Sequence, residues 1–432
     1  YWTTLTATVG DAPVSQLDTR PEHENTTIFV QDRWRPMDNL TVAGGIRWDR
    51  QEILDTFGVT HIDLKDDYAP RLGIVWDPSH AGRQKVYGSF GRFVEKIPMD
   101  LVIRSFSGER QARIFNFSPD SLVPDPDAGD SGILGGAEEP VDPDLESQYM
   151  EEVILGYEHQ IRPDVAVGVK AIWREYGQVI EDFVCRDDYT YCIGNPGEGI
   201  MSEVFTYDVS RTFPAPEAQR DFQGVQLELH KRFSESWQLM ASYLWSEIEG
   251  NFDGGYAPFT NVGADPNISA AYDYWDHFTD GIDLERVTNC GPLSNDREHQ
   301  LRASGYYLTD FGLSIGGTAY YRTGTPRTRY GFSDGYGRYE FFLTERGAEG
   351  RTPEIYEADL HLGYPLELDR VTVHFLLDVF SVLNAQRAIL VDQRWGFEQA
   401  DNSSPTPVNE NYGKPILRTP PTTFRVGVRL SF

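Results

Sequence analysis

The sequence predicts an all-β protein, namely a transmembrane antiparallel β-barrel of which about 14 strands are visible in this chain. Three observations lead to this prediction. Apolar and polar residues alternate in segments of roughly ten residues, short turns alternate with long polar loops, and no run of roughly 18 apolar residues is present that could form a membrane-spanning helix. Hydrophobic residues make up 40% of the chain, which does not exclude a barrel, because barrel loops and inward-facing side chains are polar.

The alternation is clearest at the C-terminus, in "TFRVGVRLSF". Every second residue from Phe424 to Phe432 is apolar, and the residues between them are polar or glycine, so one face of the expected strand is apolar. In a soluble sandwich that face would contact a second sheet, whereas in a barrel it would contact lipid. Comparable runs are found at 1–9, 25–35, 39–52, 67–77, 85–95, 147–160, 164–177, 219–233, 236–250, 296–308, 311–323, 354–366, 370–382 and 421–432.

Charged residues recur in the middle of these strands, on the face opposite the apolar one. A barrel would direct this second face into its lumen. The residues that we expect to face the lumen are Arg47, Lys170, Arg174, Glu228, His230, His374, Asp378 and Arg429.

The connections favour the barrel over the sandwich. Short turns at 35–39, 161–164, 234–236, 309–312 and 368–370 alternate with long polar loops at 96–146, 178–218, 251–295, 324–353 and 383–420. Long loops without secondary structure are uncommon in compact soluble domains, whereas membrane barrels have short periplasmic turns and long external loops. We expect tryptophans at the strand ends to form interfacial girdles, although hairpin packing would also explain them: Trp34, Trp48, Trp76, Trp173 and Trp245.

Charge and cysteine content limit the partners and the compartment. The net charge of -29 excludes nucleic acid as a partner, argues mildly against an anionic substrate and leaves peptides, glycans and cationic ligands open. Cys185 and Cys192 bracket a short polar segment, and a disulfide between them would place that segment outside the cytoplasm.

No catalytic arrangement is found, so we expect neither an enzyme nor a cofactor. The sequence has no HExxH, no Gly-x-Ser-x-Gly and no phosphate-binding glycine loop. Asp125, Asp127 and Asp130 could together bind calcium, but they do not match EF-hand spacing, and solvated loop charge is the simpler interpretation.

Several hairpins resemble the C-terminal barrel of TonB-dependent outer-membrane receptors, in particular the Oar-like branch. The resemblance rests on "TTIFVQDRWRPMDNLTVAGGIRWD", on "YAPRLGIVWDP" followed by "KVYGSFGRFVEKIP", and on "FLLDVFSVLNAQ". It covers most strands and none of the long loops. The final "RVGVRLSF" is similar to the terminal signal by which such proteins are presented to the barrel-assembly machinery, with Arg425, Gly427, Leu430 and Phe432 at the signal positions.

The resemblance implies an outer-membrane receptor of a Gram-negative bacterium that moves a large substrate through a plugged barrel of about 22 strands, in contact with outer-membrane lipid and a TonB-type energy-coupling protein. We then expect residues 1–432 to form the C-terminal portion of the barrel, with the plug, the TonB-contacting segment and the first strands outside this sequence. Two alternatives remain open. One is a passive channel of about 14 strands, closed between the runs at 1–9 and 421–432, and the other is a structural or adhesive barrel.

Overall fold

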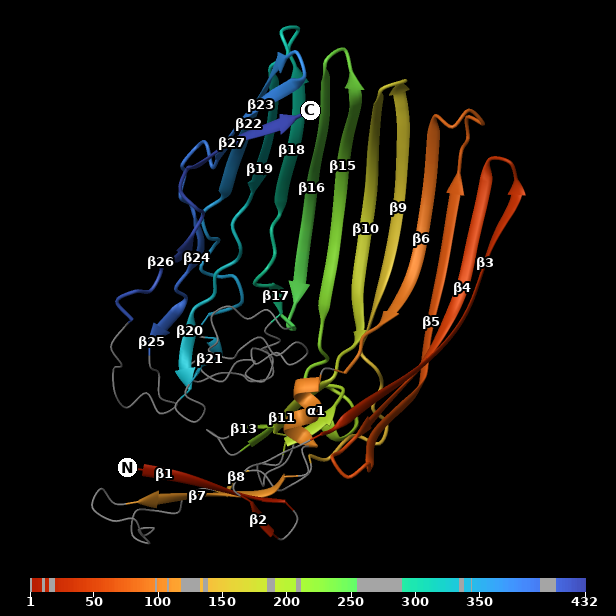
Figure 1. Ribbon diagram of the computed structural model, residues 1–432. Helices are drawn as coiled ribbons and strands as arrows, with labels where there is room; N and C mark the ends of the chain where they lie inside the picture. Colours follow the sequence, from red (N-terminus) through yellow and green to blue (C-terminus); the bar gives the residue numbers. More distant parts are fainter. Residues whose placement is uncertain are drawn as a thin grey trace.

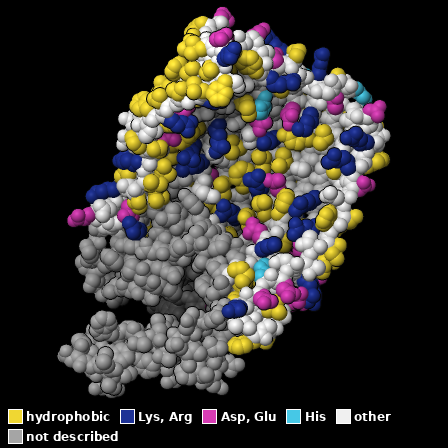
Figure 2. All heavy atoms as spheres, viewed as in Figure 1, with side chains coloured by type: hydrophobic (Ala, Val, Ile, Leu, Met, Phe, Trp, Pro, Cys, Tyr) yellow, Lys and Arg dark blue, Asp and Glu magenta, His cyan; other side chains and the backbone are white. Residues whose placement is uncertain are grey.

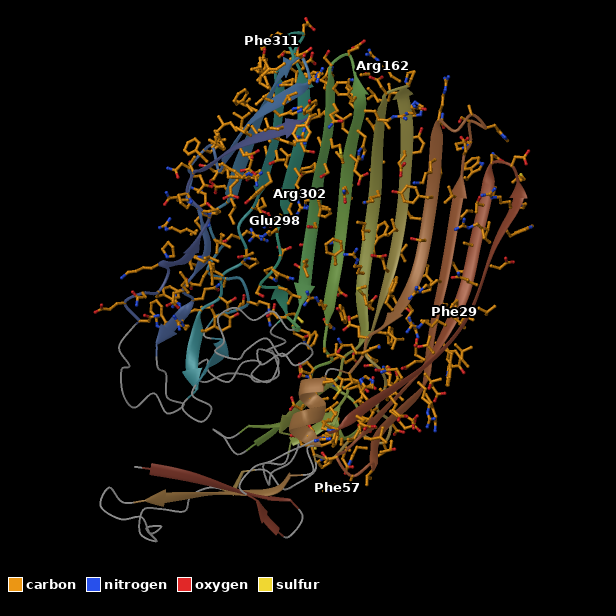
Figure 3. The ribbon with its side chains drawn as sticks, viewed as in Figure 1. Phe29, Phe57, Arg162, Glu298, Arg302 and Phe311 are labelled. Atoms are coloured by element: carbon orange, nitrogen blue, oxygen red, sulfur yellow. The ribbon has the colours of Figure 1, made fainter. Side chains whose placement is uncertain are left out.

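The computed structural model of the chain is a single curved sheet of long antiparallel strands, with smaller sheets gathered at one end (Figure 1). The structure describes residues 2–9, 12–14, 20–97, 99–106, 109–117, 133–134, 139–184, 191–206, 211–254, 290–333, 338–342, 344–396 and 409–432. We call the two ends of the sheet the short-turn end and the long-loop end, after the connections that lie there. Phe311 and Arg162 lie at the short-turn end, and Phe57 lies at the long-loop end (Figure 3).

The main sheet contains 14 strands, in agreement with the predicted fold class. Each strand pairs with the next long strand of the chain, which is the connectivity of an up-and-down barrel wall. In spatial order the strands are β27 (Thr423–Ser431), β23 (Val371–Phe380), β22 (Ile355–Leu368), β19 (Ser314–Arg322), β18 (His299–Leu308), β16 (Trp237–Gly250), β15 (Arg220–Ser234), β10 (Val165–Gln178), β9 (Tyr149–Arg162), β6 (Gln84–Val94), β5 (Thr60–Trp76), β4 (Leu40–Leu54) and β3 (Glu22–Met37), with β17 (Gly291–Pro292) beside β16.

One face of the main sheet is apolar and exposed, and we call it the apolar face. The register aligns its side chains across strands: Phe375 lies opposite both Tyr364 and Val428. A contiguous apolar surface of this size is unfavourable in water, so it requires lipid or protein cover. Its most exposed members include Ile28, Val30, Ile46, Leu72, Ile74, Leu155, Val169, Trp173, Leu227, Trp245, Leu301, Tyr307, Leu366, Phe375, Phe424, Val426, Val428 and Leu430.

The long loops contain secondary structure of their own, which the sequence analysis did not predict. A short helix, α1 (Met99–Ser105), and a 3-10 turn, η1 (Gly199–Met201), are present, and no helix of the described residues is long and apolar enough to cross a membrane. The small strands are β2 (Ala12–Val14), β7 (Glu109–Phe117), β8 (Ile133–Leu134), β11 (Glu181–Val184), β12 (Tyr191–Gly194), β13 (Glu203–Thr206), β14 (Arg211–Pro214), β20 (Tyr330–Ser333), β21 (Arg338–Phe342), β24 (Ala388–Val391), β25 (Arg394–Gly396) and β26 (Pro415–Arg418).

The run at 1–9 was wrongly assigned to the barrel. It forms β1 (Trp2–Val9), but β1 pairs with β2 and β7 in a separate sheet of four strands. Alternation identifies a strand but not its partner, and the neighbouring residues of β7 provide a long antiparallel register. The segment 53–66, which lies between the predicted runs at 39–52 and 67–77, extends β4 and β5 to a tight turn at residues 55–59.

The predicted position of three tryptophans was also wrong, because the strands are longer than expected. Trp48, Trp173 and Trp245 lie within β4, β10 and β16 rather than at their ends. Trp237 and Trp245 lie on the same face of β16, roughly 26 Å apart along the strand at about 3.3 Å per residue; at a strand tilt of about 35–45° this is a height of roughly 20 Å, comparable to the roughly 25 Å apolar band of membrane barrels. The strands therefore continue past this band at the long-loop end.

The buried core of the described residues lies at the long-loop end rather than inside the sheet. Leu101 and Val102 of α1, with Phe106, pack against Ile53 of β4 and Ile62 of β5. A ring contact joins this core to β5, since His61 stacks on Phe106 with centroids 4.6 Å apart. The loops are thus folded onto the sheet at one end, where they can form a ligand-binding surface.

Candidate functional site

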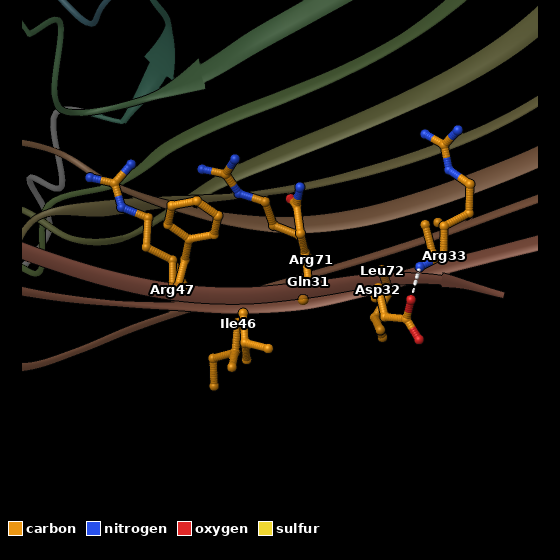
Figure 4. Close-up of a pocket in the computed structure, with 14 residues that line it drawn as sticks. Gln31, Asp32, Arg33, Ile46, Arg47, Arg71 and Leu72 are labelled. Atoms are coloured by element: carbon orange, nitrogen blue, oxygen red, sulfur yellow. Dashed lines mark hydrogen bonds between the residues drawn. The ribbon is translucent and has the colours of Figure 1, made fainter.

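The face opposite the apolar one carries most of the charged strand residues, and we call it the polar face. Arg33, Arg47 and Arg71 extend to one side of β3–β5, whereas Ile46 and Leu72 point to the other side (Figure 4). Lys, Arg, Asp and Glu side chains are interspersed with apolar ones over the hollow surface in view (Figure 2). A wall with one apolar and one polar face is the arrangement that a membrane barrel needs.

All eight residues expected to face the lumen lie on the polar face. The pairing register places Arg47 beside Ala69, Lys170 beside Gly156 and Arg429 beside His374. In each strand these residues alternate with the exposed apolar ones and therefore point to the other side of the sheet. The same alternation holds for Arg174, Glu228, His230 and Asp378. That this face lines the lumen of a closed barrel stays a prediction.

The structure joins several of these residues in cross-strand ion pairs. Lys170 Nζ on β10 lies 3.1 Å from Glu228 Oε1 on β15, and within β15 itself His230 Nε2 lies 3.6 Å from Glu228 Oε2. Arg174 Nε donates to Glu152 Oε2 at 2.6 Å. Opposite charges on neighbouring strands stabilise the pairing modestly, so these contacts also fix the orientation of the side chains.

A second network lies at the C-terminal end of the sheet. Asp378 on β23 contacts His361 Nδ1 at 2.6 Å and accepts a hydrogen bond from Arg425 Nε at 2.8 Å. Arg425, which was expected to belong to the assembly signal, thus also ties β27 to its neighbour. Leu430 lies on the exposed apolar face and Phe432 is 96% exposed, while Gly427 lies opposite Leu376. The signal itself stays a prediction.

The polar face has a charge balance opposite in sign to that of the chain. Its cations outnumber its carboxylates, although the whole chain has a net charge of -29. The excess of Asp and Glu is therefore located elsewhere. The cations are Arg33, Arg47, Arg71, Lys85, Lys170, Arg174, Arg220, Arg302, Arg322, Arg425 and Arg429, and the carboxylates are Asp49, Asp67, Glu152, Glu158, Glu228, Glu357, Asp359, Glu367 and Asp378.

Some of these cations are available to a ligand or a partner. Within the described part of the chain, Arg33, Arg71 and Arg302 form no ion pair, and Arg71 lies over the ring of Phe93 at 4.9 Å. Arg33 and Arg71 border a hollow of about 860 Å³ at β3–β5, and Arg302 borders one of about 680 Å³ over β15–β19. Volumes of this size can accept a side-chain cluster or a small ligand.

Buried hydrogen bonds hold the loops onto the long-loop end of the polar face. The amide of Gln51, 2% exposed, donates to the Glu95 carbonyl at 3.1 Å and accepts from the Ile97 amide at 3.2 Å. Ser147 Oγ donates to Asp67 Oδ2 at 2.6 Å. Because these polar groups satisfy one another, the loop segments near 95–97 and 147 are fixed to the strands.

The turn that joins β4 to β5 is organised by one carboxylate. Asp55 Oδ1 accepts hydrogen bonds from the Phe57 and Val59 amides, each at 2.8 Å, and Oδ2 lies 3.2 Å from His61 Nε2. Burial opposes ionisation of Asp55, but these donors together hold the pKa of its carboxyl below its usual value. The turn therefore presents the exposed side chain of Phe57 on a rigid support.

Some predicted site residues lie outside the described residues. These are Cys185, Asp125, Asp127 and Asp130. Cys192 is buried in β12, Cys290 is an exposed free thiol, and the predicted disulfide stays a prediction. In the described ranges, no group of three or more His, Cys, Asp or Glu side chains is arranged to hold a metal ion.

Sequence reasoning missed several residues of the polar face, among them Arg71, Arg302, Glu152 and His361. The signal that could have found them is alternation within each strand, because each directly neighbours an apolar residue of the opposite face, namely Leu72, Leu301, Val153 and Leu362 respectively. The ion pairs between strands could not be found in this way, since they depend on which strands are neighbours and in which register.

Known proteins share both the sequence pattern and the fold. The family model described as TonB dependent receptor-like, beta-barrel, matches residues 2–384. The TonB-dependent transporter Oar of Myxococcus xanthus is 29% identical over 494 residues, covering 98% of this chain and 44% of that protein. The FrpB iron transporter of Neisseria meningitidis superposes with a TM-score of 0.55 at 14% identity, covering 95% of this chain and 46% of that one. The ferripyoverdine receptor of Pseudomonas aeruginosa gives a TM-score of 0.51 at 12% identity, covering 89% and 37%.

Proposed function

The chain belongs to the family of TonB-dependent receptor-like β-barrels, and from this premise we propose that it forms much of the wall of a transporter that moves a large substrate through a plugged barrel. Members of this family are outer-membrane proteins of Gram-negative bacteria and are transporters rather than enzymes. The apolar face contacts outer-membrane lipid, and the long-loop end faces the outside of the cell.

The chain spans about half the length, or less, of the relatives it matches. In our proposal the rest of the protein supplies further strands, to a total of about 22, together with a plug and a segment that contacts a TonB-type protein. Barrel-assembly machinery would insert the protein through the signal on β27. Within the described residues, β3 and β27 each pair with one neighbour, which leaves an edge on each for additional strands.

The observation that carries the proposal is the polar face with Arg33, Arg71 and Arg302, which form no ion pair with the residues that the structure describes. A plug is a folded polar body that must be held inside the wall and yet released, and exposed hydrogen-bonding cations suit such a reversible contact. Arg33 and Arg71 border one hollow of this face and Arg302 another. In our proposal the substrate is one too large for diffusion through porins, moved inward or outward.

A passive channel is the main alternative. It requires closure between the first run of the chain and the last, but β1 pairs with β2 and β7, and β27 pairs with β23. This pairing counts against a closed barrel of about 14 strands. A structural or adhesive barrel predicts long loops equally well and is distinguished by the lack of transport.

Cross-linking to the plug tests the proposal directly. A photoreactive residue at position 71 should cross-link to N-terminal peptides of the native protein, whereas one at the neighbouring position 72 should not, because Leu72 points to the apolar face. Intact mass and N-terminal peptide mapping of membrane-extracted protein should give a mass far above 49.0 kDa. A mass near 49.0 kDa together with steady single-channel conductance would refute the plugged transporter in favour of a passive pore.

A further inference from the structure

Two aromatic rings and a carboxylate surround one cation at the long-loop end. Trp395 in β25 and Tyr412 meet edge to face, with ring centroids 4.8 Å apart and planes at 86°. The guanidinium carbon of Arg329 lies 4.0 Å from the centroid of Trp395 and 5.8 Å from that of Tyr412. Glu349 closes the third side, since its Oε1 accepts from Arg329 Nη2 at 2.7 Å and its Oε2 accepts from the Tyr412 hydroxyl at 3.0 Å. We call Trp395, Tyr412 and Glu349 the aromatic corner.

The guanidinium of Arg329 is not fully satisfied in this position. Its Nε atom is buried and has no hydrogen-bond partner in the described part of the chain. A buried donor without an acceptor destabilises the bound arrangement, which makes Arg329 an imperfect occupant. A guanidinium carried by another molecule can approach from a different direction, so its Nε need not be buried without an acceptor.

The backbone around Arg329 is held independently of its side chain. The Tyr330 amide donates to the Gln393 carbonyl at 3.0 Å, and the Arg329 amide donates to Thr344 Oγ1 at 3.2 Å. β20 also pairs with β25 and β21. The side chain of Arg329 can therefore leave the aromatic corner without unfolding the loop.

The chemistry of the aromatic corner selects a planar cation. Ring faces attract cations electrostatically, most strongly for Trp, and a carboxylate supplies directed acceptors for a guanidinium. The chain contains 67 Asp and Glu residues against 38 Lys and Arg, so its overall field concentrates cations rather than anions near the loops.

We propose that the aromatic corner is a binding site for an arginine side chain of a peptide ligand, and that Arg329 is an internal occupant which this ligand displaces. The inference rests on the proposed function only for the placement of the site outside the cell. Because β20 and β25 come from two different long loops, displacement of Arg329 changes the contact between them.

Binding to the complete protein in detergent, without TonB, tests this proposal. The probe is Nα-acetyl-arginine amide, titrated by saturation-transfer NMR, and its neutral isostere Nα-acetyl-citrulline amide is the ligand control. Arg329→Ala should bind the arginine probe about tenfold or more tightly than the unchanged protein, because the internal competitor is gone. Adding Trp395→Ala to this variant should abolish the gain.

Arg327→Ala is the matched protein control. Arg327 also contacts Glu349, but through a hydrogen bond from Nη2 to the backbone carbonyl at 2.6 Å, so its removal should not change binding. Arg329→Gln keeps the side-chain length and should show the same gain if Arg329→Ala does not fold. Equal binding by the unchanged protein and a folded Arg329 variant, or equal binding of the citrulline probe, would overturn the proposal. If the complete protein binds the probe as expected but transports nothing, the proposed function is refuted and the proposed binding site is not.

Discussion

The buried ion pair between Arg346 and Asp253 provides the sharpest test of how the long loops are held. The two side chains are 1% and 2% exposed, respectively. Arg346 Nη2 also donates to the Asn251 carbonyl at 3.2 Å, and Asp253 Oδ1 accepts from the Ser294 amide at 3.0 Å. The pair thus connects three segments of the long-loop end, near residues 251–253, 294 and 346.

Replacing Arg346 by Met removes the charge while keeping most of the side-chain volume. It leaves the Asp253 carboxylate buried without its cation, and breaking a buried pair in this way costs about 3–5 kcal/mol. At 1.4 kcal/mol per factor of ten, the open population of these loops should rise by about a hundredfold to a thousandfold or more. We expect the central strands of the main sheet to be unaffected, because the hydrogen bonds of Arg346 to Asp253 and Asn251 lie beyond the end of β16.

Native-state hydrogen exchange, read by mass spectrometry on peptides covering 290–297 and 344–350, measures this opening. Arg302→Met is the control, since Arg302 makes no ion pair within the described residues and should leave exchange unchanged. The double variant Arg346→Met with Asp253→Asn should recover part of the protection, because no charge is then left buried. If Arg346→Met exchanges at the rate of the control, the assignment of this pair as the anchor of the loops is wrong.

Three further outcomes are expected. The hydrogen bond from Ser234 and then Lys231 lower the pKa of Asp164 to about 2. The stabilisation of this turn by the Asp164 carboxylate is therefore complete above pH about 4 and is lost as the pH falls towards 2. A carbon-detected NMR titration should show this low pKa, and Asp164→Asn should remove the pH dependence of the turn's stability. Peptide mapping without reductant should recover Cys185 joined to Cys192. Deletion of Phe432 should lower the yield of assembled protein in the outer membrane several-fold, because the terminal aromatic of the assembly signal is lost.

Each of these has an internal control. Arg232 donates its amide to the Asp164 carbonyl, and exchange at this amide should follow the same pH window. Cys290, an exposed free thiol, should be alkylated without reduction. Phe311→Ser removes an exposed aromatic from a short turn and should leave assembly unchanged; equal loss for both Phe variants would argue against a specific terminal signal.

The fold class was predictable because membrane strands repeat one simple rule many times. Period-two alternation locates strands such as β10 and β23 within two or three residues. It also assigns each side chain to a face, since a slip of one residue would exchange the apolar and polar faces. The same rule placed Lys170 and Asp378 on the polar face. It failed for β1, because alternation is equally strong in a strand of a small separate sheet.

The loops could not be predicted in the same way. Their elements depend on contacts between distant segments, such as Gln51 with Glu95 or Arg329 with Trp395. α1 has only seven residues, too few for a clear helical period. The aromatic corner is assembled from residues 329, 349, 395 and 412, and nothing in the local sequence connects these positions.

In the proposed transporter, the extension of the strands beyond the tryptophans sets the height at which a ligand would meet the protein. Five residues of β16 follow Trp245, and at about 3.3 Å per residue they rise roughly 16 Å along the strand. At a strand tilt of about 35–45° this is a height of roughly 12 Å, about one and a half times the Debye length of roughly 8 Å at physiological ionic strength. Charges on the lipid headgroups are therefore largely screened at the loops, and ligand capture should respond to the protein's own carboxylates and to salt, but little to the lipid composition of the surrounding membrane.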